Sequence, residues 1–322
     1  MNLWLVALFL LWIVLHLKTS RPDGTFIRDL HPYRRIMGYI MPTRNESVVY
    51  FESFIDAEAL LSYLAKAKEK FDVDISHCLV AAIAMCMHEN PTMNRFSAGR
   101  RLYQRKGVFV TFSMKRKALD RVAKLATVKT HFEPGEPFRA FCERINAKIG
   151  VERSGQRTYA DQEFDVFEAM PRPLLRGGVT LMKLADYFNL LPATFIENDP
   201  MYTSVFVANL GSLDMRAGFH HLYEWGTCSA FLMAGKIEPR PVVVDGRVAV
   251  RDILHIRWTY DERMDDGLNA RFGLVTVQRV LENPYENLGC LNEDGSDARP
   301  MGAARDRAPR VSEVSVGARA AG

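Results

Sequence analysis

The fold class is decided by Tyr260-Asp261-Glu262-Arg263-Met264-Asp265-Asp266-Gly267, a charged stretch between two regular apolar patterns. Residues 252–260 before it read as a strand, and residues 268–281 after it have the apolar spacing of an amphipathic helix. Upstream, Asp245-Gly246 lies between two valine-rich runs, which predicts a two-residue β-hairpin. This end of the chain is therefore predicted as strand, strand, loop and closing helix.

The remaining patterns place helices early and strands late in the chain. Strands are expected at 48–54, 107–114, 204–210, 230–237 and 241–250, and helices at 57–68, 79–88, 117–125, 137–148 and 178–190. Ser76 is the expected N-cap of the helix at 79–88. Together these patterns predict an α+β domain, with a mixed sheet covered by helices on one face.

The composition argues against several classes of protein. The 322 residues carry 42 basic and 38 acidic side chains, and this small net charge of +4 does not indicate a nucleic-acid partner. Five scattered cysteines without a Cys-x-x-Cys pair argue against a disulfide framework. His77, Cys78, Cys86 and His88 lack the spacing that would let one helix face chelate, so no metal site is predicted.

Residues 1–17 contain no formally charged side chain and are apolar around the whole helical circumference. This pattern predicts a transmembrane helix, although it is shorter than the ~20 residues that span a bilayer comfortably. A cleaved signal peptide is the alternative, but no basic residue precedes the apolar run and no small-x-small site follows it. Lys18, Arg21 and Arg28 follow closely, so we expect a single-pass membrane protein with its main domain in the cytoplasm.

Composition also divides the chain. The expected segments are an N-terminal membrane anchor at 1–17, a linker at 18–29, one folded domain at 30–288 and a disordered tail at 289–322. The tail is assigned because its sequence is rich in Gly, Ala, Arg, Asp and Ser and has few apolar residues.

The stretch at 260–267 resembles the Asp-His-Arg-x-x-Asp-Gly signature of the acyltransferase catalytic domain of 2-oxo acid dehydrogenase complexes, and its relative in chloramphenicol acetyltransferase. Three other pieces resemble the same family and occur in the same order. They are Arg34-Arg35-Ile36-Met37-Gly38-Tyr39-Ile40-Met41, Glu89-Asn90-Pro91-Thr92-Met93-Asn94 and Ala208-Asn209-Leu210-Gly211.

The resemblance implies a chloramphenicol-acetyltransferase-like fold that assembles as a homotrimer. It further implies an active site between subunits, where an acyl-CoA donor and a small-molecule acyl acceptor meet. It implies no permanently bound cofactor, and no residue is assigned to coenzyme A binding. No lipoyl domain precedes the domain in this sequence, so a role as the core of a dehydrogenase complex is not expected.

Two positions of the family pattern differ in this chain. Glu262 stands where the resemblance places the general-base histidine, and Ala208 stands where it places the hydroxyl that stabilises the oxyanion. Asp266 would be structural and paired with Arg34. Since the pKa of glutamate is about 2 units below that of histidine, a thiol would lose its proton to Glu262 at an extra cost of about 3 kcal/mol. Ser204 or Ser212 could take the place of the missing hydroxyl.

His221, beside His220, is the alternative base, because residues 220–226 superficially resemble the chloramphenicol acetyltransferase version of the motif. Trp225, however, occupies the position where that motif requires aspartate. Two functions stay open at this point. One is a membrane-anchored, CoA-dependent acyltransferase with Glu262 as an unusual base. The other is a non-catalytic trimeric module that binds or scaffolds at the membrane.

Overall fold

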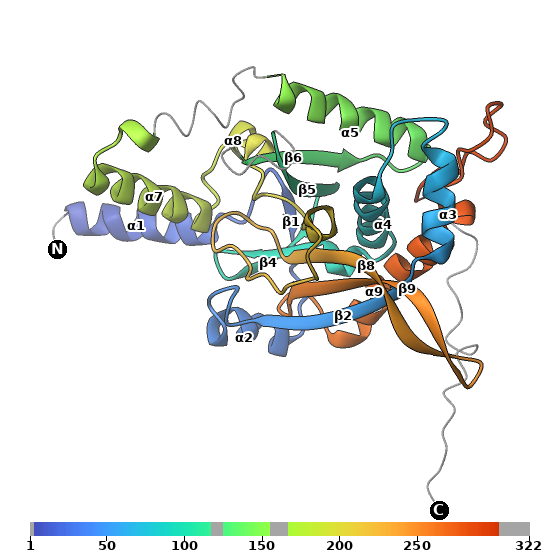
Figure 1. The fold of residues 1–322 in the computed structure, drawn as a ribbon. Helices are drawn as coiled ribbons and strands as arrows, with labels where there is room; N and C mark the ends of the chain where they lie inside the picture. The colour runs from blue at the N-terminus through green and yellow to red at the C-terminus, as the bar shows by residue number, and fades with distance from the viewer. Residues whose placement is uncertain (1–2, 117–124, 155–166, 303–322) are drawn as a thin grey trace, which may run out of the picture.

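A six-stranded mixed sheet forms the centre of the computed structural model, which describes residues 3–116, 125–154 and 167–302 (Figure 1). The strand order is β2-β9-β8-β7-β5-β6, in which β7 runs parallel to both β5 and β8 and the other neighbours are antiparallel. The strands are β2 (Val48–Asp56), β5 (Val108–Lys115), β6 (Leu125–Phe132), β7 (Val205–Asn209), β8 (Ala230–Val244) and β9 (Arg247–Asp261).

Four helices cover one face of this sheet, as the sequence predicts: α3 (Glu58–Ala67), α4 (Ile75–Glu89), α5 (Phe138–Arg153) and α9 (Gly267–Glu282). Alternate residues of β9 point into this layer, so Leu254, Ile256, Trp258 and Tyr260 belong to the main core. The N-cap of α4 is Asp74, whose side chain accepts from the backbone N–H of His77, and the prediction of Ser76 is wrong. Further helices in the described ranges include α2 (Pro32–Ile40), α7 (Arg172–Tyr187), α8 (Ala193–Asn198) and α10 (Pro284–Asn287).

The predicted hairpin at Asp245-Gly246 is confirmed, and both turn residues have positive φ angles, 49° and 76°. Its strands are longer than the sequence suggests, because β8 and β9 are each 15 residues long and continue where separate strands were expected. A register shift lies between Ala234 and Ile237, and β8 then continues past Pro239 and Pro241, paired with β9. The end of the hairpin therefore extends beyond the helical layer (Figure 1).

A second, three-stranded sheet of order β1-β4-β3 was not predicted from the sequence. Its strands are β1 (Gly24–Phe26), β3 (Arg95–Ala98) and β4 (Arg101–Arg105). Since β1 lies within residues 18–29, the prediction of a linker there is corrected: this segment is part of the fold. At the other end, residues 289–302 pack onto the domain through buried Met301, so the predicted tail is also corrected over that range. The rest of the predicted tail lies outside the described residues, as does the helical pattern predicted at 117–125 except for Leu125, which begins β6.

The apolar helix α1 (Leu3–Leu17) is the feature that departs most from expectation. Its 15 residues extend for about 22 Å, which is less than the ~30 Å hydrocarbon core of a bilayer. In the part of the chain that the structure describes, no helix is long and apolar enough to cross a membrane. This finding does not support the predicted transmembrane helix or the predicted single-pass membrane location.

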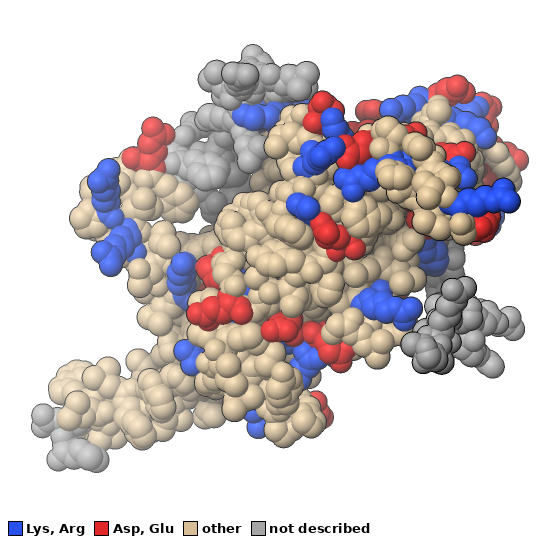
Figure 2. All heavy atoms as spheres, turned by 60° about the horizontal axis from the view of Figure 1, so that its bottom comes forward, with Lys and Arg blue, Asp and Glu red and all other residues tan. Residues whose placement is uncertain are grey.

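Helix α1 is instead joined to the domain at its C-terminal end, where Arg101 donates to the carbonyl oxygens of His16 and Lys18. The ring of His16 also contacts Phe188 edge-on, at 5.1 Å between centroids. Beyond these contacts the helix projects from the body as an arm without charged residues (Figure 2).

Candidate functional site

The altered loop at 260–267 connects the end of β9 to the start of α9. A buried ion pair between two of its own residues stabilises it. Asp261 is 0% exposed, and its carboxylate accepts from Arg263 Nε at 2.9 Å and from a terminal Arg263 nitrogen at 2.7 Å. The Ser47 hydroxyl donates to the same carboxylate at 2.9 Å. Because each charge is compensated at short range, this pair fixes the backbone on both sides of Glu262.

Arg34 on α2 also binds the loop. One guanidinium nitrogen donates to the carbonyl oxygen of Glu262 at 3.1 Å, and another lies 3.6 Å from both Asp265 and Asp266. The ion pair expected between Arg34 and Asp266 is therefore present, and Asp265 shares it. Asp266 is also the N-cap of α9, where its side chain accepts from the backbone N–H of Asn269 at 3.0 Å.

Glu262 itself is half-buried and lies one residue beyond the end of β9. Its backbone N–H donates to the carbonyl oxygen of Ser47 at 2.9 Å, and Arg34 binds its own carbonyl oxygen. No described residue forms a hydrogen bond or an ion pair with the Glu262 carboxylate. The loop thus fixes the main chain of this residue and presents its side chain without a protein counter-charge.

Tyr260 and Asp265 lie beneath the loop and were not singled out by sequence reasoning. Burial raises the pKa of Tyr260 above its ordinary value, and the neighbouring Asp265 carboxylate acts in the same direction. The tyrosine therefore stays protonated at neutral pH. Neither its hydroxyl nor the second oxygen of Asp265 has a hydrogen-bond partner among the described residues.

Ala208 lies near the C-terminal end of β7, next to a cavity of about 330 Å³. The neighbouring Asn209 donates to the hydroxyl oxygen of Ser76 at 3.0 Å, in the same cavity lining. Neither proposed substitute for the missing hydroxyl is well placed. Ser212 donates its proton to the carbonyl oxygen of Asn209 at 2.7 Å, and Ser204 is four residues away along the chain, or about 13 Å.

Glu262 and Ala208 do not come together within one chain. Ala208 of β7 pairs with Met233 of β8, which pairs with Arg257 of β9. Glu262 lies five residues after Arg257 in the sequence. Five strand residues span about 17 Å and two strand spacings about 10 Å, which gives a separation of about 20 Å. No single reacting group bridges that distance, so any site that uses both positions requires a second copy of the chain.

His221 lies in the loop that covers the other face of the sheet. Its Nδ1 lies 3.0 Å from the carbonyl oxygen of Leu222, and that of His220 lies 2.7 Å from the carbonyl oxygen of His221. A carbonyl oxygen can only accept, so Nδ1 carries the proton in both rings and Nε2 is the nitrogen that could act as a base. Among the described residues, no set of three or more His, Cys, Asp or Glu side chains is placed to hold a metal ion.

Residues 197–288 match the family model of the 2-oxoacid dehydrogenases acyltransferase catalytic domain, and this range contains both β7 and the altered loop. Over this range the chain is similar to that catalytic domain. The resemblance inferred from the sequence is therefore confirmed. This match does not test the replacement of histidine by Glu262.

Individual relatives support the same assignment over a shorter stretch. The succinyltransferase component of the 2-oxoglutarate dehydrogenase complex of Rickettsia conorii is 38% identical over 60 residues, which cover 19% of this chain and 15% of that protein. The corresponding protein of Cupriavidus necator is 39% identical over 56 residues, or 17% and 14% of the two chains. The aligned stretch is thus a small part of each relative.

Solved structures show the acyltransferase fold over most of the chain. A probable dihydrolipoamide acetyltransferase of Listeria monocytogenes has a TM-score of 0.53 at 17% identity, covering 80% of this chain and 95% of that one. A truncated catalytic core of the 2-oxoacid dehydrogenase multienzyme complex of Thermoplasma acidophilum has a TM-score of 0.51 at 15% identity, covering 81% and 99%. The predicted α+β fold is confirmed.

Proposed function

We propose that this protein is a CoA-dependent acyltransferase that works as a homotrimer, in which Glu262 of one subunit faces the end of β7 of the next. The observation that carries the proposal is the Glu262 carboxylate, which is fixed at its backbone and has no partner among the described residues. The separation of about 20 Å between Glu262 and Ala208 supports a site completed by a second subunit.

The chemistry follows from the position of the carboxylate. Glu262 accepts the proton of an acceptor thiol or hydroxyl as that group attacks the carbonyl carbon of an acyl-CoA thioester. The tetrahedral intermediate then collapses, the bond to sulfur breaks, and the CoA thiolate takes up the proton as it leaves. Because glutamate is a weaker base than histidine by about 2 pKa units, we expect turnover to be slow.

The identity of the acyl group and of the acceptor is not part of the proposal. The Rickettsia relative is named as a succinyltransferase component of a dehydrogenase complex, but only 15% of its length is matched. We therefore propose only an acyl-CoA donor and a small-molecule acceptor.

A specific observation favours the non-catalytic alternative, a trimeric binding module. Ala208 supplies no hydroxyl, and Ser204 and Ser212 do not replace it within the chain. Loss of one oxyanion donor lowers turnover by about 100- to 1000-fold in enzymes that use one.

One experiment separates the two functions. The full chain is incubated with acetyl-CoA and longer acyl-CoAs, and release of the CoA thiol is followed with and without a dithiol acceptor. Under the proposal, Glu262→Gln abolishes acceptor-dependent release and Glu262→His increases it by up to about 100-fold. Glu197→Gln, which changes an exposed glutamate on α8, serves as the matched control and leaves turnover unchanged.

Two results would refute the proposal. If the folded oligomer does not bind any acyl-CoA by calorimetry, the protein is a binding module of another kind. Turnover that is unaffected by Glu262→Gln removes the glutamate from the mechanism, and a parallel His221→Gln variant then tests the remaining base.

A further inference from the structure

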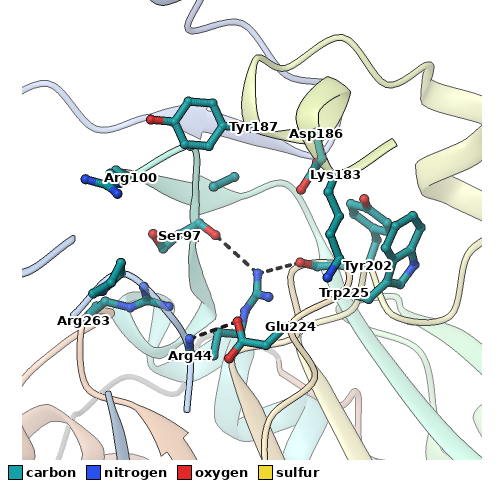
Figure 3. A pocket seen from close by; sticks show the side chains of 14 residues that line it. Arg44, Ser97, Arg100, Lys183, Asp186, Tyr187, Tyr202, Glu224, Trp225 and Arg263 are labelled. Carbon is teal, nitrogen blue, oxygen red and sulfur yellow. Dashed lines mark hydrogen bonds between the residues drawn. The ribbon is translucent and has the colours of Figure 1, made fainter. Parts of the chain in front are cut away.

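A second cavity lies beside the altered loop, on the side of the small sheet, and encloses about 270 Å³ (Figure 3). This volume equals that of roughly nine water molecules, so it suits a small organic molecule. Its walls come from segments that are distant in sequence. They are the β3–β4 turn at 97–100, the end of α7 at 183–187, the loop at 224–226, Pro42, Arg44, Tyr202 and Arg263.

Arg44 forms the inner wall and is only 7% exposed. Its guanidinium group donates to the carbonyl oxygens of Tyr223, Gly226 and Ser97, at 3.0, 2.5 and 3.4 Å. No carboxylate of a described residue lies within 4.0 Å of this guanidinium group. Arg44 therefore contributes a buried positive charge that main-chain dipoles hold in place and that interacts with the Glu224 carboxylate in the same lining.

Arg100 and Lys183 line the same cavity and are exposed. Arg100 lies over the ring of Tyr39 at 5.3 Å, and neither side chain forms a hydrogen bond or an ion pair with a described residue. Figure 3 shows Lys183 extending from α7 along the cavity, toward the side formed by Tyr202 and Trp225. Two cationic side chains are thus free to bind a ligand.

The acidic residues in the lining are already engaged. Asp186 pairs with buried Arg21 at 3.0 Å. Glu224 accepts from the backbone N–H groups of Arg44 and Asn45, at 3.2 and 3.0 Å, and from the Asn45 side chain at 2.7 Å. The donors to Glu224 are neutral, so its negative charge offsets that of Arg44, and the lining charges that remain without a protein counter-charge are those of Arg100 and Lys183.

The β3–β4 turn places Arg100 on the side of the cavity opposite Lys183 (Figure 3). Gly99 and Arg100 both have left-handed backbones, with φ angles of 55° and 60°. A side chain at Gly99 would collide with the carbonyl oxygen of Tyr187, because the turn packs directly on the last residue of α7. This contact holds Arg100 and Lys183 on the same cavity.

We propose that this cavity binds a small organic dianion, a phosphate monoester or a short dicarboxylate, between Arg100 and Lys183. Charge-assisted hydrogen bonds from the two side chains bind the anionic group. Tyr187 and Trp225 offer ring surface to a planar body. The site is separate from acyl transfer and does not depend on it.

Calorimetric titration of the full chain tests the proposal, in phosphate-free buffer of low ionic strength, with inorganic phosphate, phenyl phosphate and malonate as probes. We expect the wild type to bind at least one of them. Arg100→Gln and Lys183→Gln should each weaken binding about tenfold, and the double variant should show none. Lys183→Arg keeps the charge and should retain binding.

Arg176→Gln is the matched control, because Arg176 is an exposed cation on α7 outside the cavity; binding should be unchanged. Binding of phosphate or of malonate alone supports the site and identifies the class of anion. The proposal is overturned if the folded wild type binds no probe at about 10 mM, or if the double variant binds as well as the wild type. Neither outcome depends on acyl-CoA turnover, so this test can fail without affecting the proposed function.

Discussion

Asp261→Asn tests whether the altered loop is held by its buried ion pair. The substitution preserves the shape of the side chain and removes its charge, which leaves Arg263, only 6% exposed, without its counter-charge. Two short hydrogen bonds from the guanidinium group become neutral-acceptor bonds or are lost. Removing one partner of such a pair costs about 3–5 kcal/mol, and we expect the free energy of unfolding to fall by that amount.

The assay is equilibrium urea unfolding at one fixed protein concentration, followed by the fluorescence of tryptophan, since Trp258 lies in the core beside the loop. Glu143→Gln is the control, because it breaks an exposed pair with Arg139 on α5 and should change stability by less than about 0.5 kcal/mol. The double variant Asp261→Asn with Arg263→Met should recover most of the loss, since no charge is then buried alone. A loss below about 1 kcal/mol in the single variant would refute the reasoning.

Two further predictions concern the small sheet and the histidines. Gly99→Ala should lower the free energy of unfolding by at least about 1–3 kcal/mol, because residue 99 has a φ of 55° and a Cβ there collides with Tyr187. Unchanged stability in urea unfolding would contradict the packing of the turn on α7. Burial holds the pKa of His255 below its ordinary value of 6.5, as it does for His220 and His131. Because the unfolded chain then binds more protons, stability should fall as the pH drops through 6.5, and unfolding curves at pH 7.5 and 6.0 check the sign.

Local patterns predict the parts of this fold that local physics determines. Asp245-Gly246 supplies two residues that tolerate positive φ between valine-rich runs, and the hairpin follows. The altered loop is likewise readable, because the alternation of β9 stops at Asp261 and the helical spacing of α9 begins at Gly267. The pairing of Arg34 with Asp266 came from the family resemblance, since 232 positions separate the two residues in the sequence.

The features that the sequence did not predict depend on contacts between distant segments. The three residues of β1 form a strand only because β4, almost 80 positions later, pairs with them. The parallel neighbours of β7 place Ala208 and Glu262 at opposite ends of the sheet, and no local pattern encodes that arrangement. The cavity proposed to bind a dianion has no sequence motif either, because Arg44, Arg100 and Lys183 come from three separate parts of the chain.

Arg263 links the two parts of the molecule for which a function is proposed. Its guanidinium group pairs with Asp261 in the altered loop and donates to the carbonyl oxygen of Met41 at 3.0 Å. Arg263 also lines the cavity proposed to bind a dianion. While Asp261 is charged, the pair is neutral and Arg263 adds little attraction for a ligand. Asp261→Asn removes that compensation, so the variant should bind phosphate or malonate several-fold more tightly than the wild type even though it is less stable. Calorimetry on samples shown to be folded by tryptophan fluorescence measures this, and equal affinity in the two proteins would mean that the charge of Arg263 does not reach the cavity.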